Sequence, residues 1–219
     1  MPKAPLLTQI PAPPAAGPRA RTYQLLLDQA MDFARSGHVP SISEVALRAK
    51  VSRATAYRYF PTRSKLVAAM VNHSLGPVRS WQPSATDGGE RVAELFEEIF
   101  PRFKEYEPQL RAALMIAVEH QLQERAGVLE EEPYRRGYRA HILENAVAPL
   151  KAELGGKGLR RLVMALASIY GIESYVVWKD IFGAGDKEVE SLARWMANAL
   201  VAAALSDVRR GKRASTVAR

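Results

Sequence analysis

The chain has 219 residues, of which 47% are apolar, enough to bury a core in one large domain or two small ones. It contains no cysteine, which excludes disulfides, thiol catalysis and cysteine-bound zinc. No uncharged apolar run is long enough to span a bilayer, and residues 1–18 lack the pattern of a signal peptide. We therefore expect a cytoplasmic protein.

The formal net charge of +8 is concentrated in residues 1–80. That segment holds eleven Lys and Arg residues against three Asp and Glu, whereas residues 81–219 hold twenty of each sign. A basic excess confined to one segment is typical of a unit that binds a polyanion, because each neutralised phosphate releases counterions. The charge distribution therefore indicates that the N-terminal third binds nucleic acid.

The sequence pattern divides the chain into four segments. Residues 1–18 are rich in Pro and Ala and predict a disordered arm. Residues 19–80 predict a DNA-binding domain, 81–210 a helical body, and 211–219 a disordered basic tail. Because no alternating strand pattern competes with the helical periodicity, we expect an all-α fold of about nine helices.

Capping signals define the helices of the first domain. An amphipathic helix is predicted over 19–36, ended by Gly37. Ser41 and Glu44 have the spacing of a capping box, which predicts the start of a short second helix. Ser52 is the expected cap of a third helix, which continues through Tyr59.

The fourth helix is expected to begin after Pro61, with Thr62 as its cap, and to end at the Gly76-Pro77 break. A linker is predicted over 81–89. Helices of the body are then expected at 90–106, from Pro108 onward, and at 133–154, 159–182 and 187–209.

The second and third helices, joined by a tight turn, have the pattern of a helix-turn-helix unit. In such a unit the second helix enters the major groove while the first lies across the DNA backbone. We expect Arg53 to bind guanine, and the methyl groups of Ala54 or Thr55 to meet thymine methyls. The residues predicted to contact DNA are Ser41, Ser52, Arg53, Ala54, Thr55, Tyr57, Arg58, Tyr59, Arg63 and Lys65.

Two residues near the end of this unit have different expected roles. Phe60 is predicted to be a core aromatic. Arg63 lies at the start of the fourth helix, where a cation is unfavourable for the helix dipole. A bound phosphate would offset this unfavourable charge. The free N–H groups of the first helical turn also favour a phosphate.

This stretch resembles the DNA-binding segment of the TetR family of transcriptional regulators, over about residues 21–75. The resemblance rests on Ser41, Val45, Ala46, Ala49, Val51, Ser52, Tyr57, Tyr59, Phe60, Arg63 and Leu66. The chain departs from the family pattern at Lys50, which stands where the family has glycine. Lys50 must therefore either adopt a left-handed backbone, which costs about 1 kcal/mol of stability, or form another kind of turn. Arg63 replaces a lysine, and Ala56 replaces a larger apolar residue.

The resemblance implies a homodimer that binds a pseudo-palindromic double-stranded DNA operator. It also implies that the last two long helices pair with their copies in the partner chain. The wide apolar arcs of both helices support this weakly, and burial within one chain is the alternative. The expected interface residues are Leu162, Leu166, Ile169, Leu192, Trp195, Met196, Ala199 and Leu200.

The resemblance further implies that a small-molecule effector binds in the helical body and releases a repressor from DNA. Glu173 is the best polar candidate, because a carboxylate on an apolar stripe needs a partner, although an arginine across the dimer would serve equally. The full set of candidates is Arg111, Glu119, His120, Tyr134, Tyr138, His141, Glu173, Tyr175 and Trp178.

Neither a cofactor nor a metal is expected, since the Glu119-His120 pair lacks the second histidine of a zinc-binding helix. Two other functions stay open at this stage, an architectural DNA-binding protein without ligand control and a helical enzyme. No glycine-rich phosphate loop or nucleophile elbow favours the enzyme. An apolar cavity with a few polar groups would favour the effector-responsive regulator.

Overall fold

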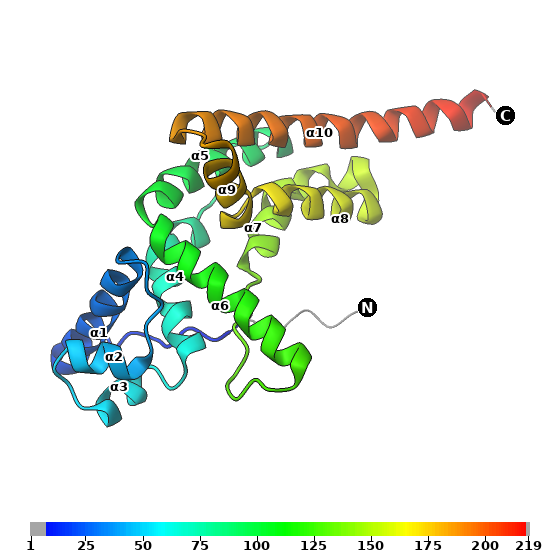
Figure 1. Cartoon of the computed structure of the whole chain (residues 1–219). Helices are drawn as coiled ribbons and strands as arrows, with labels where there is room; N and C mark the ends of the chain where they lie inside the picture. Colours follow the sequence, from blue (N-terminus) through cyan, green and yellow to red (C-terminus); the bar gives the residue numbers. More distant parts are fainter. Residues whose placement is uncertain (1–7, 218–219) are drawn as a thin grey trace. The chain divides into compact units, whose positions relative to one another are not determined.

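The computed structural model describes residues 8–217, with side chains to Gly211, and every regular element in this part is helical (Figure 1). The predicted all-α fold is therefore confirmed. The elements are α1 (Gly17–Arg35), α2 (Ile42–Arg48), α3 (Arg53–Tyr59), α4 (Arg63–Arg79), α5 (Gly88–Glu105), α6 (Glu107–Ala126), α7 (Tyr138–Val147), the 3-10 turn η1 (Ala148–Leu150), α8 (Lys151–Ile169), α9 (Ile172–Val176), the π-helical turn η2 (Val177–Ile181) and α10 (Asp186–Val217).

The described residues form two compact units. The first contains the chain up to Gly76 together with 105–137, and the second contains 77–104 and the chain from Tyr138 onward. Helix α6 packs against α1 in the first unit, where the Gln109 side-chain amide donates to the carbonyl of Met31 at 3.1 Å. The sequence pattern had grouped this helix with the body at 81–210, because helical periodicity does not reveal which neighbour a helix packs against.

The predicted caps of the first unit are confirmed. The backbone N–H of Glu44 donates to the Ser41 hydroxyl at 3.2 Å, and the N–H of Ser41 donates to the Glu44 carboxylate at 2.7 Å. This backbone hydrogen bond is the main cause that lowers the pKa of Glu44. Ser52 caps α3 by accepting from the Thr55 N–H at 3.1 Å, and Thr62 accepts from the Lys65 N–H at 3.2 Å.

Lys50 forms the turn between α2 and α3 with a left-handed backbone, at φ 56°. This confirms one of the two options expected for a lysine at the position that glycine fills in the TetR family. The Val51 N–H then donates to the Ala46 carbonyl at 3.0 Å. Ala46 and Ala49 are both buried, and their small side chains allow α2 and α3 to cross closely.

Residues 8–16 differ from the predicted disordered arm, because they lie against the first unit. The Thr8 hydroxyl donates to the carbonyl of Pro133 at 3.2 Å and accepts from the N–H of Arg135 at 2.7 Å. The Tyr23 hydroxyl donates to the Pro11 carbonyl at 3.3 Å. Residues 1–7 of the predicted arm lie outside the described residues.

In the second unit, α8 and α10 run side by side (Figure 1). One stripe of α10 is buried at every fourth residue and consists of small side chains, Val189, Ala193, Ala197 and Val201. Small residues at this spacing allow the two helices to approach closely. Aromatic side chains also pack in this core, with the rings of Phe96 and Tyr170 5.1 Å apart and those of Phe103 and Tyr175 5.7 Å apart.

Several helix ends differ from the prediction. Helix α4 continues through Gly76 and Pro77 to Arg79, and α7 begins at Tyr138 rather than at 133. Gly155 has a left-handed backbone, at φ 65°, and breaks α8 internally. The helix predicted over 159–182 is interrupted at Tyr170 and Gly171, after which α9 and η2 follow.

Helix α10 extends to Val217, so residues 211–217 are helical where a disordered tail was expected. Residues 218–219 lie outside the described part. Asp207, one turn before this extension, pairs with Arg161 of α8 at 3.2 Å and with Arg210 at 2.9 Å. Once these pairs order the preceding turns, adding residues to an existing helix is cheaper than starting a new one.

No single helix of the described chain is both long and apolar enough to cross a membrane. Two consecutive helical segments, 138–169 and 172–181, are bent by 41° relative to each other. Taken together, they are long and apolar enough for a membrane span by length and composition alone.

We predict that Lys50→Gly raises the free energy of unfolding by about 1 kcal/mol, because glycine adopts a left-handed backbone without strain. Gly37→Ala is the matched control: Gly37 has φ 80° and open space around it, so alanine there adds only backbone strain. This variant should lose about 1 kcal/mol. Urea denaturation measures both, and a destabilised Lys50→Gly variant would contradict the assigned backbone.

Candidate nucleic-acid interface

The first turn of α3 presents exposed side chains. Arg53 and Ala54 are exposed and Thr55 is half-buried, whereas Ala56 and Phe60 are buried in the first unit. Phe60 packs 5.0 Å from the ring of Tyr23, which confirms its predicted role as a core aromatic. Helix α3 therefore has one face packed in the core and another that exposes polar and small side chains to solvent.

The aromatic and basic residues that follow this turn also differ in burial. Tyr57 and Arg58 are exposed. Tyr59 is half-buried, and its ring meets Tyr23 edge-on at 6.3 Å. Tyr57 and Arg58 are thus accessible to solvent, while Tyr59 is held partly by packing.

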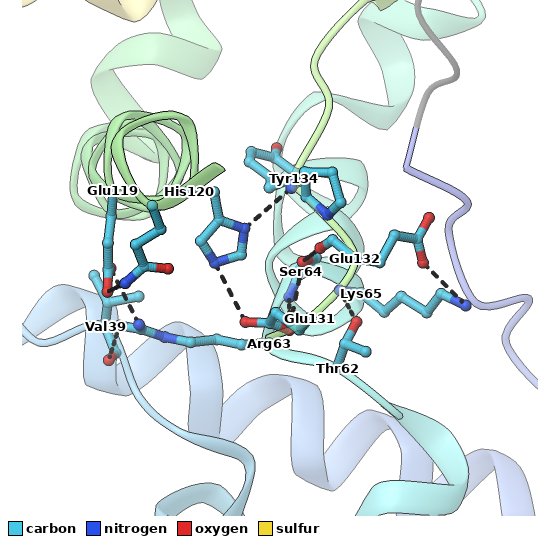
Figure 2. Close-up of polar contacts among 12 residues, drawn as sticks. Val39, Thr62, Arg63, Ser64, Lys65, Glu119, His120, Glu131, Glu132 and Tyr134 are labelled. Atoms are coloured by element: carbon cyan, nitrogen blue, oxygen red, sulfur yellow. Dashed lines mark hydrogen bonds and ion pairs between the residues drawn. The ribbon is translucent and has the colours of Figure 1, made fainter. Parts of the chain in front are cut away.

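Arg63, at the start of α4, is engaged inside the first unit. Its guanidinium lies 3.2 Å from the Glu119 carboxylate of α6 and donates to the Val39 carbonyl at 3.1 Å (Figure 2). Its Nε atom is buried and finds no hydrogen-bond partner in the part of the chain that the structure describes. The predicted phosphate-binding cation therefore already has an anionic partner in the free protein.

The next two residues of α4 also contact acidic residues, from the loop that follows α6 (Figure 2). The Ser64 N–H donates to the Glu131 carboxylate at 3.3 Å, and the Ser64 hydroxyl donates to the Glu132 carbonyl. The Lys65 ammonium lies 3.5 Å from the Glu132 carboxylate. Carboxylates thus face the free N–H groups and cations of this helix start, where an anion is favourable.

His120 holds this loop in place. The residue is 2% exposed, and its Nδ1 accepts from the backbone N–H of Tyr134 at 3.1 Å. Its Nε2 lies 3.2 Å from the Glu131 carboxylate. A buried histidine therefore connects the carboxylate at α4 to the backbone of the loop.

An open cleft of about 490 Å³ lies in the first unit. Its lining includes three residues predicted to contact DNA, Ser41, Tyr57 and Arg63. It also includes three acidic residues, Glu119, Glu130 and Glu131. The cleft is therefore lined by opposite charges.

The nine effector candidates divide between the two units. In the first unit Arg111 pairs with Glu107 at 2.8 Å, Glu119 and His120 make the contacts above, and Tyr134 is buried. In the second unit Trp178 is buried and His141 is exposed. The Tyr175 hydroxyl lies 3.3 Å from Asp186, and Arg79 stacks over the ring of Tyr138 at 4.2 Å.

Glu173 has the partner that its position demanded, and that partner belongs to the same chain. The Arg139 guanidinium lies 2.6 Å from its carboxylate and also donates to the Ala167 carbonyl at 2.9 Å. The guanidinium packs against the backbone of Gly171, where a Cβ would lie 2.3 Å from it. A side chain at Gly171 would therefore force the ends of the Arg139 and Glu173 side chains to move.

Tyr170 is a buried polar residue that the sequence analysis did not single out. Its hydroxyl is buried in the second unit and has no hydrogen-bond partner among the described residues, and burial strongly raises its pKa. Leaving a buried hydroxyl unpaired costs free energy, so such a group needs an explanation. In the sequence Tyr170 looked like one more apolar residue of a helix stripe.

The proposed dimer residues also divide by exposure. Leu162, Leu166 and Ile169 are buried within the single chain, and Leu192, Met196 and Leu200 are half-buried. Ala199 and Trp195 are exposed, and Trp195 is 68% exposed. The second unit also exposes large apolar side chains that were not predicted, Met164, Ile181 and Phe182.

The sequence analysis also missed Ser64, Glu131 and Glu132. The run Glu130 to Glu132 was visible as an acidic cluster, but nothing in the sequence assigned it to the start of α4.

The comparisons with known proteins agree with this geometry. Residues 38–70 match the family model described as bacterial regulatory proteins, tetR family, and this range contains α2, α3 and the first half of α4. This segment is similar to the helix-turn-helix of that family. The match covers the turn at Lys50 and the exposed start of α3.

The fold of the chain is similar to that of solved TetR-family regulators. A tetR-family transcriptional regulator from Streptomyces coelicolor is 23% identical, with a TM-score of 0.58 over 87% of each chain. A TetR transcriptional regulator from Rhodococcus sp. RHA1 is 21% identical, with a TM-score of 0.50 over 82% of this chain and 96% of that one. The similarity of fold to these regulators therefore includes the helices that follow the helix-turn-helix. Comparison with curated proteins gave no match.

We predict that His120→Ala lowers the free energy of unfolding by about 2 kcal/mol, because it removes the side chain that accepts from the buried Tyr134 N–H. His141→Ala is the control, since that histidine is exposed on α7, and should change stability by less than about 0.5 kcal/mol. Chemical denaturation compares the two variants. Equal effects would show that His120 does not hold the loop.

Proposed function

We propose that this protein is a cytoplasmic, sequence-specific DNA-binding transcriptional regulator that reads the major groove with α3. The observation that carries the proposal is the exposed, capped first turn of α3 within a TetR-family helix-turn-helix. Arg53 suits a bidentate contact to guanine, and the Ala54 methyl suits contact with thymine. The basic excess of residues 1–80 supports attraction to the DNA backbone.

The contacts that orient α3 come from the residues around it. Tyr57 and Arg58 are exposed beyond its first turn, and the Ser41 hydroxyl lies on the wall of the same cleft as Tyr57. Hydroxyl and guanidinium groups at such positions bind phosphate oxygens and fix the register of the protein on the duplex. Arg63 and Lys65 complete this set when they exchange their carboxylate partners for phosphates.

The regulator acts as a homodimer through α8 and α10. Support comes from the exposed apolar side chains of the second unit, Trp195 on α10 and Met164 on α8. A dimer related by a two-fold axis presents two copies of α3 to half-sites about 34–36 Å apart, or a multiple of that distance, which requires a pseudo-palindromic operator.

A small-molecule effector releases this repressor from its operator. The buried, unpaired Tyr170 hydroxyl supports a polar anchor for the effector in the second unit, near the Arg139 and Glu173 pair. The effector shifts the protein away from the DNA-binding state only if it binds the two states with different affinity. Among the candidates, Glu173, Tyr175 and Trp178 lie on α9 and η2, which directly follow Tyr170.

The experiment that tests DNA recognition is capture of genomic fragments by the purified protein, followed by sequencing. The proposal expects a recurring pseudo-palindrome among the captured fragments. Fragments without any shared sequence would contradict sequence-specific recognition, and the genes beside the recurring sites would indicate the chemical class of the effector.

We predict that Arg63→Ala weakens binding to every duplex and lowers the slope of log affinity against log salt by about one. Arg53→Ala is the matched comparison, because it should relax preference at one base pair per half-site by about 1–3 kcal/mol. Fluorescence anisotropy at several salt concentrations, with operator and mixed-sequence duplexes, separates the two effects. An unchanged salt slope for Arg63→Ala would contradict its phosphate role.

We predict that Trp195→Glu shifts the protein from dimer to monomer, because it places a charge at the centre of the proposed apolar interface. Leu47→Glu is the control, since Leu47 is 81% exposed on α2 and lies outside that interface. Light scattering of both variants after gel filtration measures their mass. A dimeric Trp195→Glu variant would place the interface elsewhere.

A further inference from the structure

The first three residues of α4 each contact a glutamate from the same unit. We propose that Glu119, Glu131 and Glu132, here called the carboxylate clamp, occupy the positions of DNA phosphates in the free protein and lower its affinity for DNA. The inference rests on the proposed function, since it concerns how the start of α4 changes partner when DNA binds.

Each glutamate of the carboxylate clamp contacts one of the first three residues of α4. Glu119 pairs with the Arg63 guanidinium, Glu131 accepts from the Ser64 N–H, and Glu132 pairs with the Lys65 ammonium (Figure 2). A helix N-terminus that carries two cations is the kind of site that binds a phosphate. Here carboxylates from far along the chain supply the negative charge instead.

The clamp faces α4 and leaves α3 open. Residues 105–137 carry seven Glu against four Arg, whereas residues 1–80 carry a net charge of +8. The acidic segment is thus folded against the basic one within a single unit. Arg53 and Ala54, which are expected to read bases, stay exposed. The clamp therefore competes with the backbone contacts, which supply affinity, and spares the base contacts, which supply specificity.

The three glutamates are not equally free to leave. Glu131 is fixed by His120, whose own position is set by the Tyr134 N–H. Glu119 lines the cleft, and its side chain is 44% exposed, against 26% for Glu131. Exchange of Glu119 for a phosphate at Arg63 is therefore easier than exchange of Glu131, and Glu119 is the residue to test.

The experiment measures binding of a fluorescent, mixed-sequence duplex to the full chain by anisotropy in dilute salt. Glu119→Gln should bind about two- to fivefold more tightly, because Arg63 no longer leaves a carboxylate to reach a phosphate. The amide oxygen of glutamine can still accept from Gln123, which bonds to Glu119 at 3.3 Å, so the fold is preserved. Tighter binding with equal or lower thermal stability supports the clamp, whereas weaker binding contradicts it.

Glu130→Gln is the matched control for charge alone. Glu130 is exposed in the same loop and lines the same cleft, and among the described residues no ion pair joins it to α4. The Glu130→Gln variant should bind the duplex with the same affinity as the wild-type protein. An equal gain from Glu130→Gln would mean that any loss of negative charge tightens binding, and the clamp would be refuted.

The double variant Arg63→Ala/Glu119→Gln isolates the pair. It should bind no more tightly than Arg63→Ala alone, and a gain that persists without Arg63 would contradict the mechanism. If Glu119→Gln fails to fold, Glu132→Gln tests the same exchange at Lys65. A wild-type protein that ignores duplexes in dilute salt refutes the proposed function, whereas a wild-type protein that binds, with no gain from Glu119→Gln, refutes the clamp alone.

Discussion

The close crossing of α2 and α3 is the constraint on which the rest of this protein depends. Buried Ala46 allows the helices to approach, and the left-handed backbone at Lys50 reverses the chain direction so that α3 can cross α2. The caps at Ser41 and Ser52 fix where each helix starts. Only with this geometry does the packed face of α3 point inward while its first turn remains available to a DNA groove.

The electrostatics of the first unit suit a change of partner. The exposed start of α3 carries no acidic neighbour in its first turn, whereas the start of α4 is neutralised by glutamates of α6 and the following loop. An ion pair at a partly exposed site contributes little to stability, so exchanging it for a phosphate costs little. Under the proposed function, the unit is then stable without DNA and still able to bind it.

The part of the fold that the sequence predicted is the part determined by neighbours along the chain. The capping box at Ser41, the cap at Ser52 and the backbone at Lys50 depend on residues within about one turn. The partner of Arg63 is 56 residues away and that of Glu173 is 34 residues away, so neither follows from local spacing. The resemblance to the TetR family implied that Leu162 and Trp195 lie together on a dimer face, although Leu162 is buried in its own chain and Trp195 is exposed.

The central claim is that α3 lies in the major groove twice in each assembly. Hydroxyl-radical footprinting of the wild-type protein on a captured genomic fragment tests it most directly. The account predicts two protected half-sites whose centres lie about 10 base pairs apart, or a multiple of that spacing, related by a pseudo-dyad. A single protected half-site bound by a monomer, or no protection even in dilute salt, would contradict it.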